Sequence, residues 1–299
     1  MLRMMHRMFP CNISCIFYIF VMTTFDAMPD LQKTALVTGA SSGIGLEFAR
    51  QLARKGYALA LVSNREQELA DAAEGLRAEY GVPVQALCID LTQPGAAEEV
   101  LAWCPEPDVL VNNAGMFFME YLSPENLGKV RTMMALYMNV VTELSILAGA
   151  RMKEKGGGHI LNISSMTARI PAPGIAIYSS TKAYLKVFGK SLSYELRPFG
   201  VQVTTVCPAA VDTGLYPLPE RLRGFLRSIG LIRTPEWLVR RSLKALFRGR
   251  RTFSPGLTNF LLPPLIAILP ARLIDRLGLK WIANHHSGLD PESPDKTTD

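Results

Sequence analysis

The chain has 299 residues, of which 48% are hydrophobic and 19% charged, so it can build a buried core and is not a disordered or fibrous chain. The formal net charge is +6, but ten Lys or Arg residues and a single acid lie between Arg221 and Arg251, so the positive charge is a local patch. No RNA-binding, helix-turn-helix or zinc-finger motif accompanies this patch, and we expect no nucleic-acid partner.

Residues 1–28 differ in character from the rest of the chain. Basic residues precede an apolar run, Cys11 to Met22, that is too short to span a bilayer but fits the apolar region of a signal peptide. The cleavage pattern is poor at Phe25-Asp26-Ala27, so a later start at Met22 or Met28 is the favoured alternative. We therefore predict an N-terminal appendage over 1–28, a catalytic domain over 29–286 and a polar, disordered tail over 287–299.

From Lys33 onward, short apolar runs alternate with amphipathic stretches. The expected strands are Thr34–Thr38, Ala58–Ser63, Val84–Ile89, Val109–Asn112, His159–Ser164 and Val201–Cys207. The first two expected helices, Gly43–Lys55 and Arg65–Tyr80, carry apolar residues on one face and are followed by Gly56 and Gly81, typical helix ends. This alternation predicts a single doubly wound, Rossmann-type α/β domain with a mostly parallel seven-stranded sheet and helices on both faces.

A glycine-rich turn, Thr38-Gly-Ala-Ser-Ser-Gly-Ile-Gly45, follows the first strand and opens a helix. Glycines there let the backbone turn tightly and approach a pyrophosphate, whose charge the helix N-terminus stabilises. A tight strand-to-helix turn without a ligand is the alternative interpretation. The spacing is T-G-x-x-x-G-x-G and differs from the G-x-G-x-x-G of long-chain dehydrogenases.

Further motifs follow in order, each at a strand end or in a helix. They are Asp90-Leu91, Asn112-Asn113-Ala114-Gly115, Asn139, Ser165 and Tyr178-x-x-x-Lys182. With this set, the chain over about Lys33 to Ala283 resembles the short-chain dehydrogenase/reductase family. The resemblance implies an NAD(P)-dependent oxidoreductase acting on CH–OH and C=O groups, with catalytic residues Asn139, Ser165, Tyr178 and Lys182.

The resemblance also implies the residues that bind the cofactor. They are Gly39, Ser41, Ser42, Gly43, Ile44, Gly45, Asn64, Arg65, Asp90, Leu91, Asn113, Ala114, Gly115, Tyr178, Lys182, Pro208, Val211 and Thr213. After the sixth strand the chain reads Pro208-Ala-Ala-Val-Asp-Thr213, where the family usually has glycine after the proline. This departure affects the expected route of the backbone near the nicotinamide.

Tyr178 and Lys182 are four residues apart in a helical pattern, so they share one helix face. A phenol normally titrates near pH 10, and a neighbouring ammonium favours the phenolate. Tyr178 is therefore expected to exchange a proton with the substrate oxygen, while the resemblance implies that Lys182 also holds the nicotinamide ribose. Ser165 is expected to stabilise the substrate oxygen, with Ser164 as its rival, and Asn139 to hold a water of the proton relay.

The end of the second strand bears on the choice of nicotinamide cofactor. It reads Leu61-Val-Ser-Asn-Arg65, with no acid for a free ribose and an arginine placed to meet a 2′-phosphate. Ser42 stands where the family often has a second basic residue, so that further support for a phosphate is missing. The alternative interpretation of Arg65 is a surface residue of the first helical turn without a role in cofactor binding. We favour NADPH, with NAD(H) as the second choice.

The substrate end is expected at Gly214 to Arg233, which holds apolar residues with basic residues between them. An apolar ketone, steroid-like or 3-oxoacyl, fits such a loop. An NAD-linked hydroxysteroid or alcohol dehydrogenase and a silent dinucleotide-binding sensor are the alternatives.

Phe260 to Ala283 is apolar but interrupted by three prolines, so it is not a spanning helix. Packing over the pocket or against a partner subunit is its favoured role, and contact with a membrane surface is the alternative. Family resemblance suggests a homo-dimer or homo-tetramer. The five cysteines show no C-x-x-C spacing and no nearby His pair, so we predict no metal site and a reducing compartment. The expected location is cytoplasmic, with association with a membrane as an option.

Overall fold

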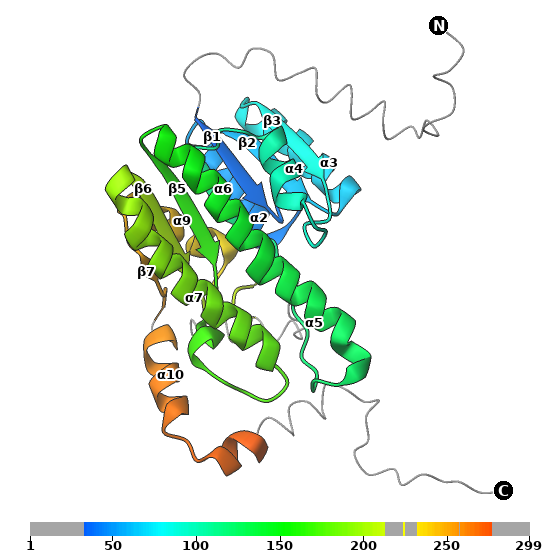
Figure 1. Ribbon diagram of the computed structural model, residues 1–299, viewed down its shortest axis with the longest axis vertical. Helices are drawn as coiled ribbons and strands as arrows, with labels where there is room; N and C mark the ends of the chain where they lie inside the picture. Colours follow the sequence, from blue (N-terminus) through cyan, green and yellow to red (C-terminus); the bar gives the residue numbers. More distant parts are fainter. Residues whose placement is uncertain (1–32, 213–223, 225–231, 257, 277–299) are drawn as a thin grey trace, which may run out of the picture. The chain divides into compact units, whose positions relative to one another are not determined.

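The computed structural model describes residues 33–212, 224, 232–256 and 258–276 (Figure 1). The predicted appendage over 1–28, the tail over 287–299 and most of the expected substrate loop lie outside the described residues. A compact unit of the chain begins at Lys33.

The central sheet consists of short strands rich in Val, Leu and Ala. They are β1 (Thr34–Thr38), β2 (Ala58–Ser63), β3 (Val84–Cys88), β4 (Val109–Asn112), β5 (Gly158–Ile163), β6 (Val201–Val206) and β7 (Thr252–Phe253). Their order is β3-β2-β1-β4-β5-β6-β7, and every neighbouring pair is parallel. The predicted fold class is confirmed. The strand order reverses between β1 and β4, where such sheets bind ligands at the strands' carboxyl ends.

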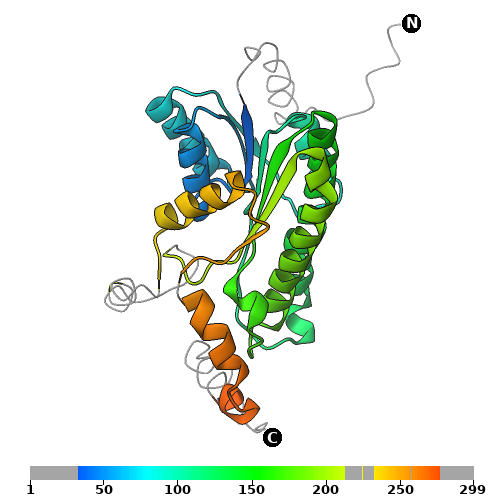
Figure 2. The same ribbon diagram turned by 90° about the vertical axis from the view of Figure 1, so that its left-hand side faces the viewer.

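Helices cover both faces of the sheet (Figure 2). One face carries α2 (Gly43–Ala53), α3 (Glu66–Tyr80) and α9 (Pro235–Phe247); the other carries α4 (Ala96–Trp103), α6 (Val140–Glu154) and α7 (Ala176–Leu196). Other helical segments are η1 (Pro124–Asn126), α5 (Leu127–Met134), η2 (Ala135–Asn139), η3 (Met166–Arg169), η4 (Arg197–Phe199) and α10 (Thr258–Ala267), and residues 271–276 are also helical. Parallel strands need such crossover helices, which leave both faces of the sheet buried.

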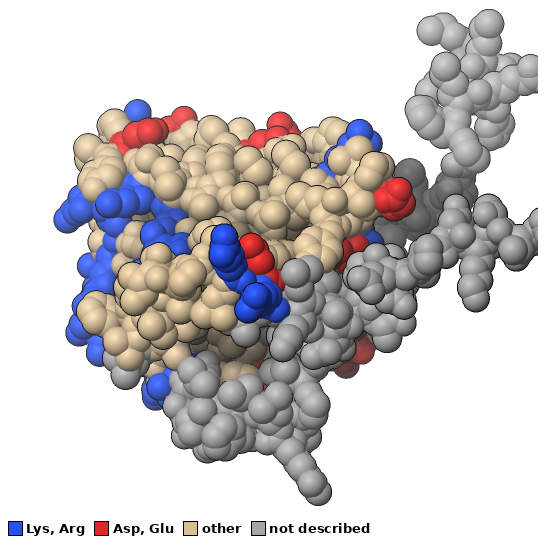
Figure 3. Space-filling view, turned by 90° about the horizontal axis from the view of Figure 1, so that it is seen from below, with Lys and Arg blue, Asp and Glu red and all other residues tan. Residues whose placement is uncertain are grey.

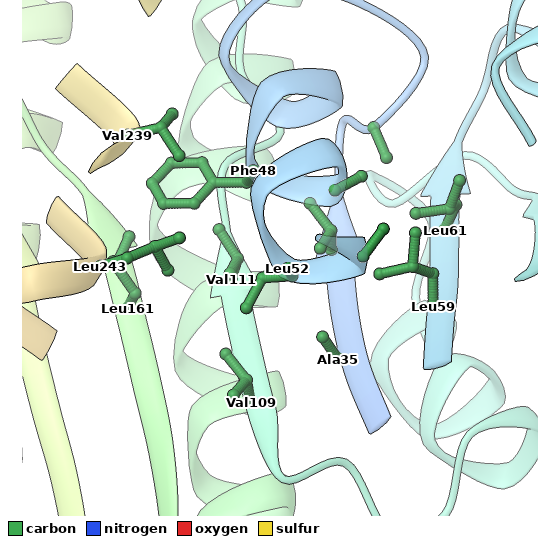
Figure 4. Close-up of a cluster of buried hydrophobic side chains, with 14 of the residues drawn as sticks. Ala35, Phe48, Leu52, Leu59, Leu61, Val109, Val111, Leu161, Val239 and Leu243 are labelled. Atoms are coloured by element: carbon green, nitrogen blue, oxygen red, sulfur yellow. The ribbon is translucent and has the colours of Figure 1, made fainter. Parts of the chain in front are cut away.

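The core between the sheet and α2 is centred on Phe48, which is fully buried. Figure 4 shows its ring beside Val239 of α9, with Leu52 of the same helix lying toward Val111 of β4. Burying a side chain of this size contributes about 1.5–3 kcal/mol. This packing holds α2, and therefore the turn before it, against the sheet.

The run from Pro124 to Glu154 is long and apolar enough to cross a membrane by length and composition. Its second part is α6, whose residues Val140, Leu144, Ala148 and Met152 are buried within the fold. A core helix of a globular domain passes the same test, and this burial is typical of one.

Helix α10 runs through Pro263 and Pro264, although prolines at these positions were expected to interrupt a helix. Pro263 has no N–H to donate to the carbonyl of Asn259, four residues earlier. That carbonyl instead accepts a hydrogen bond of 2.6 Å from the Arg169 guanidinium of η3. A long-range side-chain contact therefore satisfies the group that the proline leaves without its helical partner.

Candidate active site

The turn between β1 and α2 has the backbone geometry that the glycine pattern predicts. Gly39 and Gly43 have positive φ angles of 64° and 55°. At Gly45 a Cβ atom would overlap the Gly39 carbonyl and the Asn113 side chain. Ser42 is the N-cap of α2 and its hydroxyl makes no capping bond, so the first amides of the helix remain available to an anion. The turn fits the pyrophosphate of a dinucleotide.

Thr38, the last residue of β1, joins this turn to the loop after β4. Its hydroxyl accepts hydrogen bonds of 3.0 Å from the backbone N–H groups of Asn113 and Ala114. The Asn113 amide donates in return to the Thr38 and Gly39 carbonyls at 3.0 and 3.2 Å. Asn113, Ala114 and Gly115 are thereby held beside the glycine-rich turn. Thr38 begins the glycine-rich motif, but the motif alone did not predict this bridging role.

The residues predicted to read the adenosine ribose lie beyond β2. The Ser63 hydroxyl donates to the Ser41 hydroxyl at 3.0 Å, which ties the end of β2 to the glycine-rich turn. Asn64 and Arg65 are exposed, and the Arg65 guanidinium lies 2.9 Å from the Glu68 carboxylate, with both side chains more than half exposed. An exposed ion pair of this kind is weak, so Arg65 is free to exchange it for a phosphate.

Asp90 and Leu91 follow β3 as predicted. Asp90 is exposed and accepts from the backbone N–H and the hydroxyl of Thr92 and from the Gln93 amide, at 2.8 to 3.0 Å. The backbone N–H of Thr92, then Gln93, lower the pKa of the Asp90 carboxyl. Leu91 is buried, so of these two residues Asp90 is the one whose side chain is exposed to a ligand.

Tyr178 and Lys182 lie in the first two turns of α7 and are both buried, with 5% and 3% of their surface exposed. The Lys182 Nζ lies 5.5 Å from the centre of the Tyr178 ring and donates to the Ile163 carbonyl at the end of β5, at 3.0 Å. Phe117 packs edge-on against Tyr178 with ring centres 4.9 Å apart. The predicted helical spacing therefore brings the phenol and the amine together at the carboxyl end of the sheet.

Burial lowers the pKa of Lys182 to about 7, and the neighbouring Cys207 thiol acts weakly in the opposite direction. The cause is desolvation, because an ammonium removed from water loses hydration that its surroundings only partly replace. The Cys207 thiol is itself buried, and burial raises its pKa, so it is a poor nucleophile.

The two serines after β5 have different partners. The Ser164 hydroxyl donates to the Lys182 carbonyl at 2.7 Å and is 2% exposed, so it fastens α7 to β5. Ser165 is the N-cap of η3, and its hydroxyl oxygen accepts from the Thr167 N–H at 3.2 Å. Ser165 retains its own proton to donate, which supports its choice over Ser164 as the substrate contact.

Asn139 ends η2, a π-helical turn between α5 and α6, and is exposed. Single π-turns within helices are frequently found at functional sites because they displace side chains from the regular helical face. The same turn holds Tyr137, which the sequence analysis does not single out. Its hydroxyl donates to the Met116 carbonyl at 2.7 Å, and its ring centre lies 3.5 Å from the Lys182 Nζ.

The loop after β6 is joined to the other site loops. Pro208 is buried, and its carbonyl accepts from the Met166 N–H at 2.8 Å. Val211 pairs with Arg233 in an isolated parallel bridge. Thr213 lies outside the described residues. The roles predicted for the site residues remain predictions, and the geometry above places the described ones at one edge of the sheet.

Comparisons with known proteins identify one family and related reductases. The sequence profile of the short chain dehydrogenase family matches residues 33–218. A very-long-chain 3-oxoacyl-CoA reductase of Danio rerio is 34% identical over 235 residues, covering 72% of this chain and 73% of that protein. The Rattus norvegicus reductase with the same description is 32% identical over 196 residues, 62% of each chain.

Two solved structures are similar over most of the chain. A short-chain dehydrogenase of Sphingobium yanoikuyae in complex with NADPH has a TM-score of 0.68 and 29% identity, covering 88% of this chain and 99% of that one. A bulky-bulky ketone specific alcohol dehydrogenase of Comamonas testosteroni has a TM-score of 0.67 and 29% identity, with coverage of 88% and 97%.

Proposed function

The chain belongs to the short-chain dehydrogenase family and is an NAD(P)-dependent oxidoreductase, and on that premise we propose that it is an NADPH-dependent reductase of apolar ketones, with 3-oxoacyl thioesters as the first candidate substrates. The observation that carries the proposal is the buried Tyr178–Lys182 pair at the carboxyl end of β5, where the Ile163 carbonyl accepts from Lys182. A dinucleotide-binding protein without chemistry has no use for a buried phenol and amine in this arrangement.

The reduced nicotinamide, when bound, supplies the hydride. Tyr178 donates its phenolic proton to the substrate oxygen as charge develops there. Lys182 is held by the Ile163 carbonyl, and its ammonium stabilises the phenolate that remains. Ser165 donates its hydroxyl hydrogen to the same substrate oxygen. Asn139, exposed at the end of the π-turn, would hold a water through which Tyr178 regains its proton.

The choice of NADPH is supported by the end of β2. That strand ends at Ser63 with no carboxylate for a free ribose 2′-hydroxyl, and Arg65 follows with a guanidinium that forms only an exposed ion pair. A guanidinium binds a phosphate through two parallel hydrogen bonds. The solved relative with NADPH agrees with this preference.

A 3-oxoacyl substrate is supported by the two reductases named above, and a bulky ketone such as a steroid by the Comamonas testosteroni enzyme. Both classes are apolar ketones. The basic patch adds a reason to prefer an anionic thioester, because Arg233, Arg240, Arg241, Lys244 and Arg248 of its described part carry no ion pair with any described carboxylate. Figure 3 shows Lys and Arg side chains gathered along one side of the face seen from below.

The test is a substrate panel with the purified full-length chain. Oxidation of NADPH and of NADH is followed with 3-oxoacyl-CoA thioesters of increasing chain length, ketosteroids, quinones and small ketones, and the Tyr178→Phe variant serves as the blank. Turnover of one apolar class with NADPH supports the proposal. Preference for NADH and alcohols supports an oxidative dehydrogenase, and cofactor binding without any turnover supports a sensor.

Association with membranes and with further copies of the chain belongs to the same proposal. Around α10, Phe260, Leu261, Leu265 and Ile268 are exposed by 53 to 77%, and Arg272 and Arg276 are exposed nearby. An apolar face flanked by basic residues suits a membrane surface on the cytoplasmic side. Flotation with lipid vesicles, compared between the chain and a Phe260→Ser, Ile268→Ser variant, tests the contact, and sedimentation tests for a dimer or tetramer.

A further inference from the structure

Tyr137 occupies a buried position between the predicted cofactor loop and the catalytic helix. It is 4% exposed, and its hydroxyl donates to the carbonyl of Met116, the residue after Gly115. A Cβ atom on Gly115 would overlap the Tyr137 hydroxyl, so the loop and the ring are closely packed. The π-turn η2 directs Tyr137 into this position two residues before Asn139.

The ring of Tyr137 lies against the amine of Lys182. The Nζ atom is 3.5 Å from the ring centre, compared with 5.5 Å from the ring of Tyr178. The two tyrosine rings are 6.0 Å apart and meet edge to face. The Lys182 amine therefore lies on the Tyr137 ring with the Tyr178 ring nearby, and the Ile163 carbonyl is its hydrogen-bond acceptor.

Within the described residues, no carboxylate forms an ion pair with Lys182. The titratable groups that face it are the phenols of Tyr137 and Tyr178 and the Cys207 thiol. A buried ammonium without a counter-ion tends to lose its proton, and burial indeed lowers the pKa of Lys182. The negative face of an aromatic ring opposes this loss, most strongly where water is excluded.

A carboxylate would also keep Lys182 charged, but it would cancel the positive field that Lys182 exerts on Tyr178. An aromatic ring stabilises the cation and carries no net charge, so the field remains. We propose that Tyr137 is a positioning residue that keeps the Lys182 amine protonated and adjacent to Tyr178 through the face of its ring. The proposal deepens the proposed function and rests on it for the role of Tyr178.

Substitutions at Tyr137 separate the ring from the hydroxyl. Tyr137→Phe keeps the ring on Lys182 and loses only the hydrogen bond to Met116. Tyr137→Leu removes the ring, and Tyr137→Met serves as a second ring-free variant if the leucine variant does not fold. Tyr184→Leu is the matched control, because Tyr184 lies on the same helix as Lys182 and bonds Thr142 of α6 instead of contacting the amine.

The measured quantity is the ionisation of Tyr178 with NADP⁺ present, read as the difference in tyrosinate absorbance between each variant and the same variant carrying Tyr178→Phe. This readout does not require a substrate, so it remains decisive if the panel shows no turnover and the proposed function fails. With a 3-hydroxyacyl-CoA alcohol as probe, the acid limb of the oxidation rate gives a second measure of the same ionisation.

We expect the ring-free variants to raise the midpoint of Tyr178 ionisation, and the acid limb, by about 0.5 to 1 pH unit, since a less protonated Lys182 stabilises the phenolate less. Tyr137→Phe and Tyr184→Leu should leave both unchanged. Unshifted midpoints in the folded ring-free variants would overturn the proposal. An equal shift in Tyr137→Phe would also overturn it, because the hydroxyl bond to Met116 would then account for the effect.

Discussion

On the β1–β2–β3 side of the sheet, the predicted site residues Asn64, Arg65 and Asp90 are exposed, whereas on the β4–β5–β6 side Tyr178 and Lys182 are at most 5% exposed. The first group would bind a ligand through charged contacts that are exposed to water. Each such contact is weak, and the side chains can rearrange. The second group must hold a phenol and an amine in one arrangement, and burial enforces it at the cost of desolvating the amine.

The glycine-rich turn follows β1, at the boundary between these two regions. It contributes backbone geometry, with Gly39 and Gly43 at positive φ and Gly45 without room for a Cβ. Changes in the buried region should therefore abolish chemistry, changes in the turn should weaken cofactor binding, and a change at the exposed Arg65 should alter the choice of cofactor.

The largest effect is expected for Tyr178→Phe. The variant lacks the proton donor but keeps the aromatic contacts with Phe117 and Tyr137, so we expect turnover to fall by about 10²- to 10⁴-fold with NADPH affinity changed by no more than a few-fold. Steady-state rates and fluorescence titration with NADPH measure the two quantities. Normal turnover would exclude Tyr178 as the proton donor.

Gly45→Ala should weaken cofactor binding and stability together. Its methyl group would displace the Gly39 carbonyl or the Asn113 amide, at a cost of about 1–3 kcal/mol in the free energy of unfolding. Urea denaturation and NADPH titration measure both effects. Gly75→Ala is the control, because Gly75 lies in the middle of α3 with open space around it and should gain about 0.5–1 kcal/mol. Equal results for the two variants would contradict the packing described here.

Arg65→Ala should change the ratio of NADPH to NADH affinity and little else. Loss of a charge-assisted contact with the 2′-phosphate should cost NADPH about 1–3 kcal/mol and leave NADH almost unchanged. The comparison is made by titration with each dinucleotide, with the exposed Arg240 replaced by alanine as the control. If both dinucleotides lose affinity equally, Arg65 does not recognise the phosphate.

The smallest effect concerns His159, the partly buried second residue of β5, which packs edge-on against Phe247 with ring centres 5.1 Å apart. Burial, and then the charge of Lys33, lower the pKa of His159. The folded chain then binds fewer protons than the unfolded chain at and below about pH 6.5, so its free energy of unfolding falls as the pH falls through that range.

We expect this loss to be under about 1 kcal/mol between pH 7.5 and 5.5, and to be absent in His159→Gln. Urea denaturation at the two pH values, compared as a difference within each protein, removes the effect of the substitution itself. A His159→Gln variant with the same pH dependence as the parent would assign the slope to other groups.

Local patterns were enough to predict most of the fold. Each predicted strand is present to within one residue at either end. Short continuous apolar runs, separated by amphipathic helical stretches, are typical of buried strands in a parallel sheet. Helix α2 ends at Ala53, two residues before the predicted Lys55, at the glycine-terminated turn formed by the following residues. The adjacency of Tyr178 and Lys182 also follows from their spacing on one helix.

Contacts between distant segments decided the rest. Nothing near Tyr137 in the sequence indicates that its ring will lie on Lys182, 45 positions later, or that the Ser164 and Ser165 hydroxyls will face different partners. The Pro263 break is tolerated because Arg169 lies close enough to bind the Asn259 carbonyl. The sequence by itself determined six of the seven strands, the glycine-rich turn and the catalytic spacing, since these depend on neighbouring residues. Only the tertiary structure decided which buried groups share a partner, since that depends on how the helices pack on the sheet.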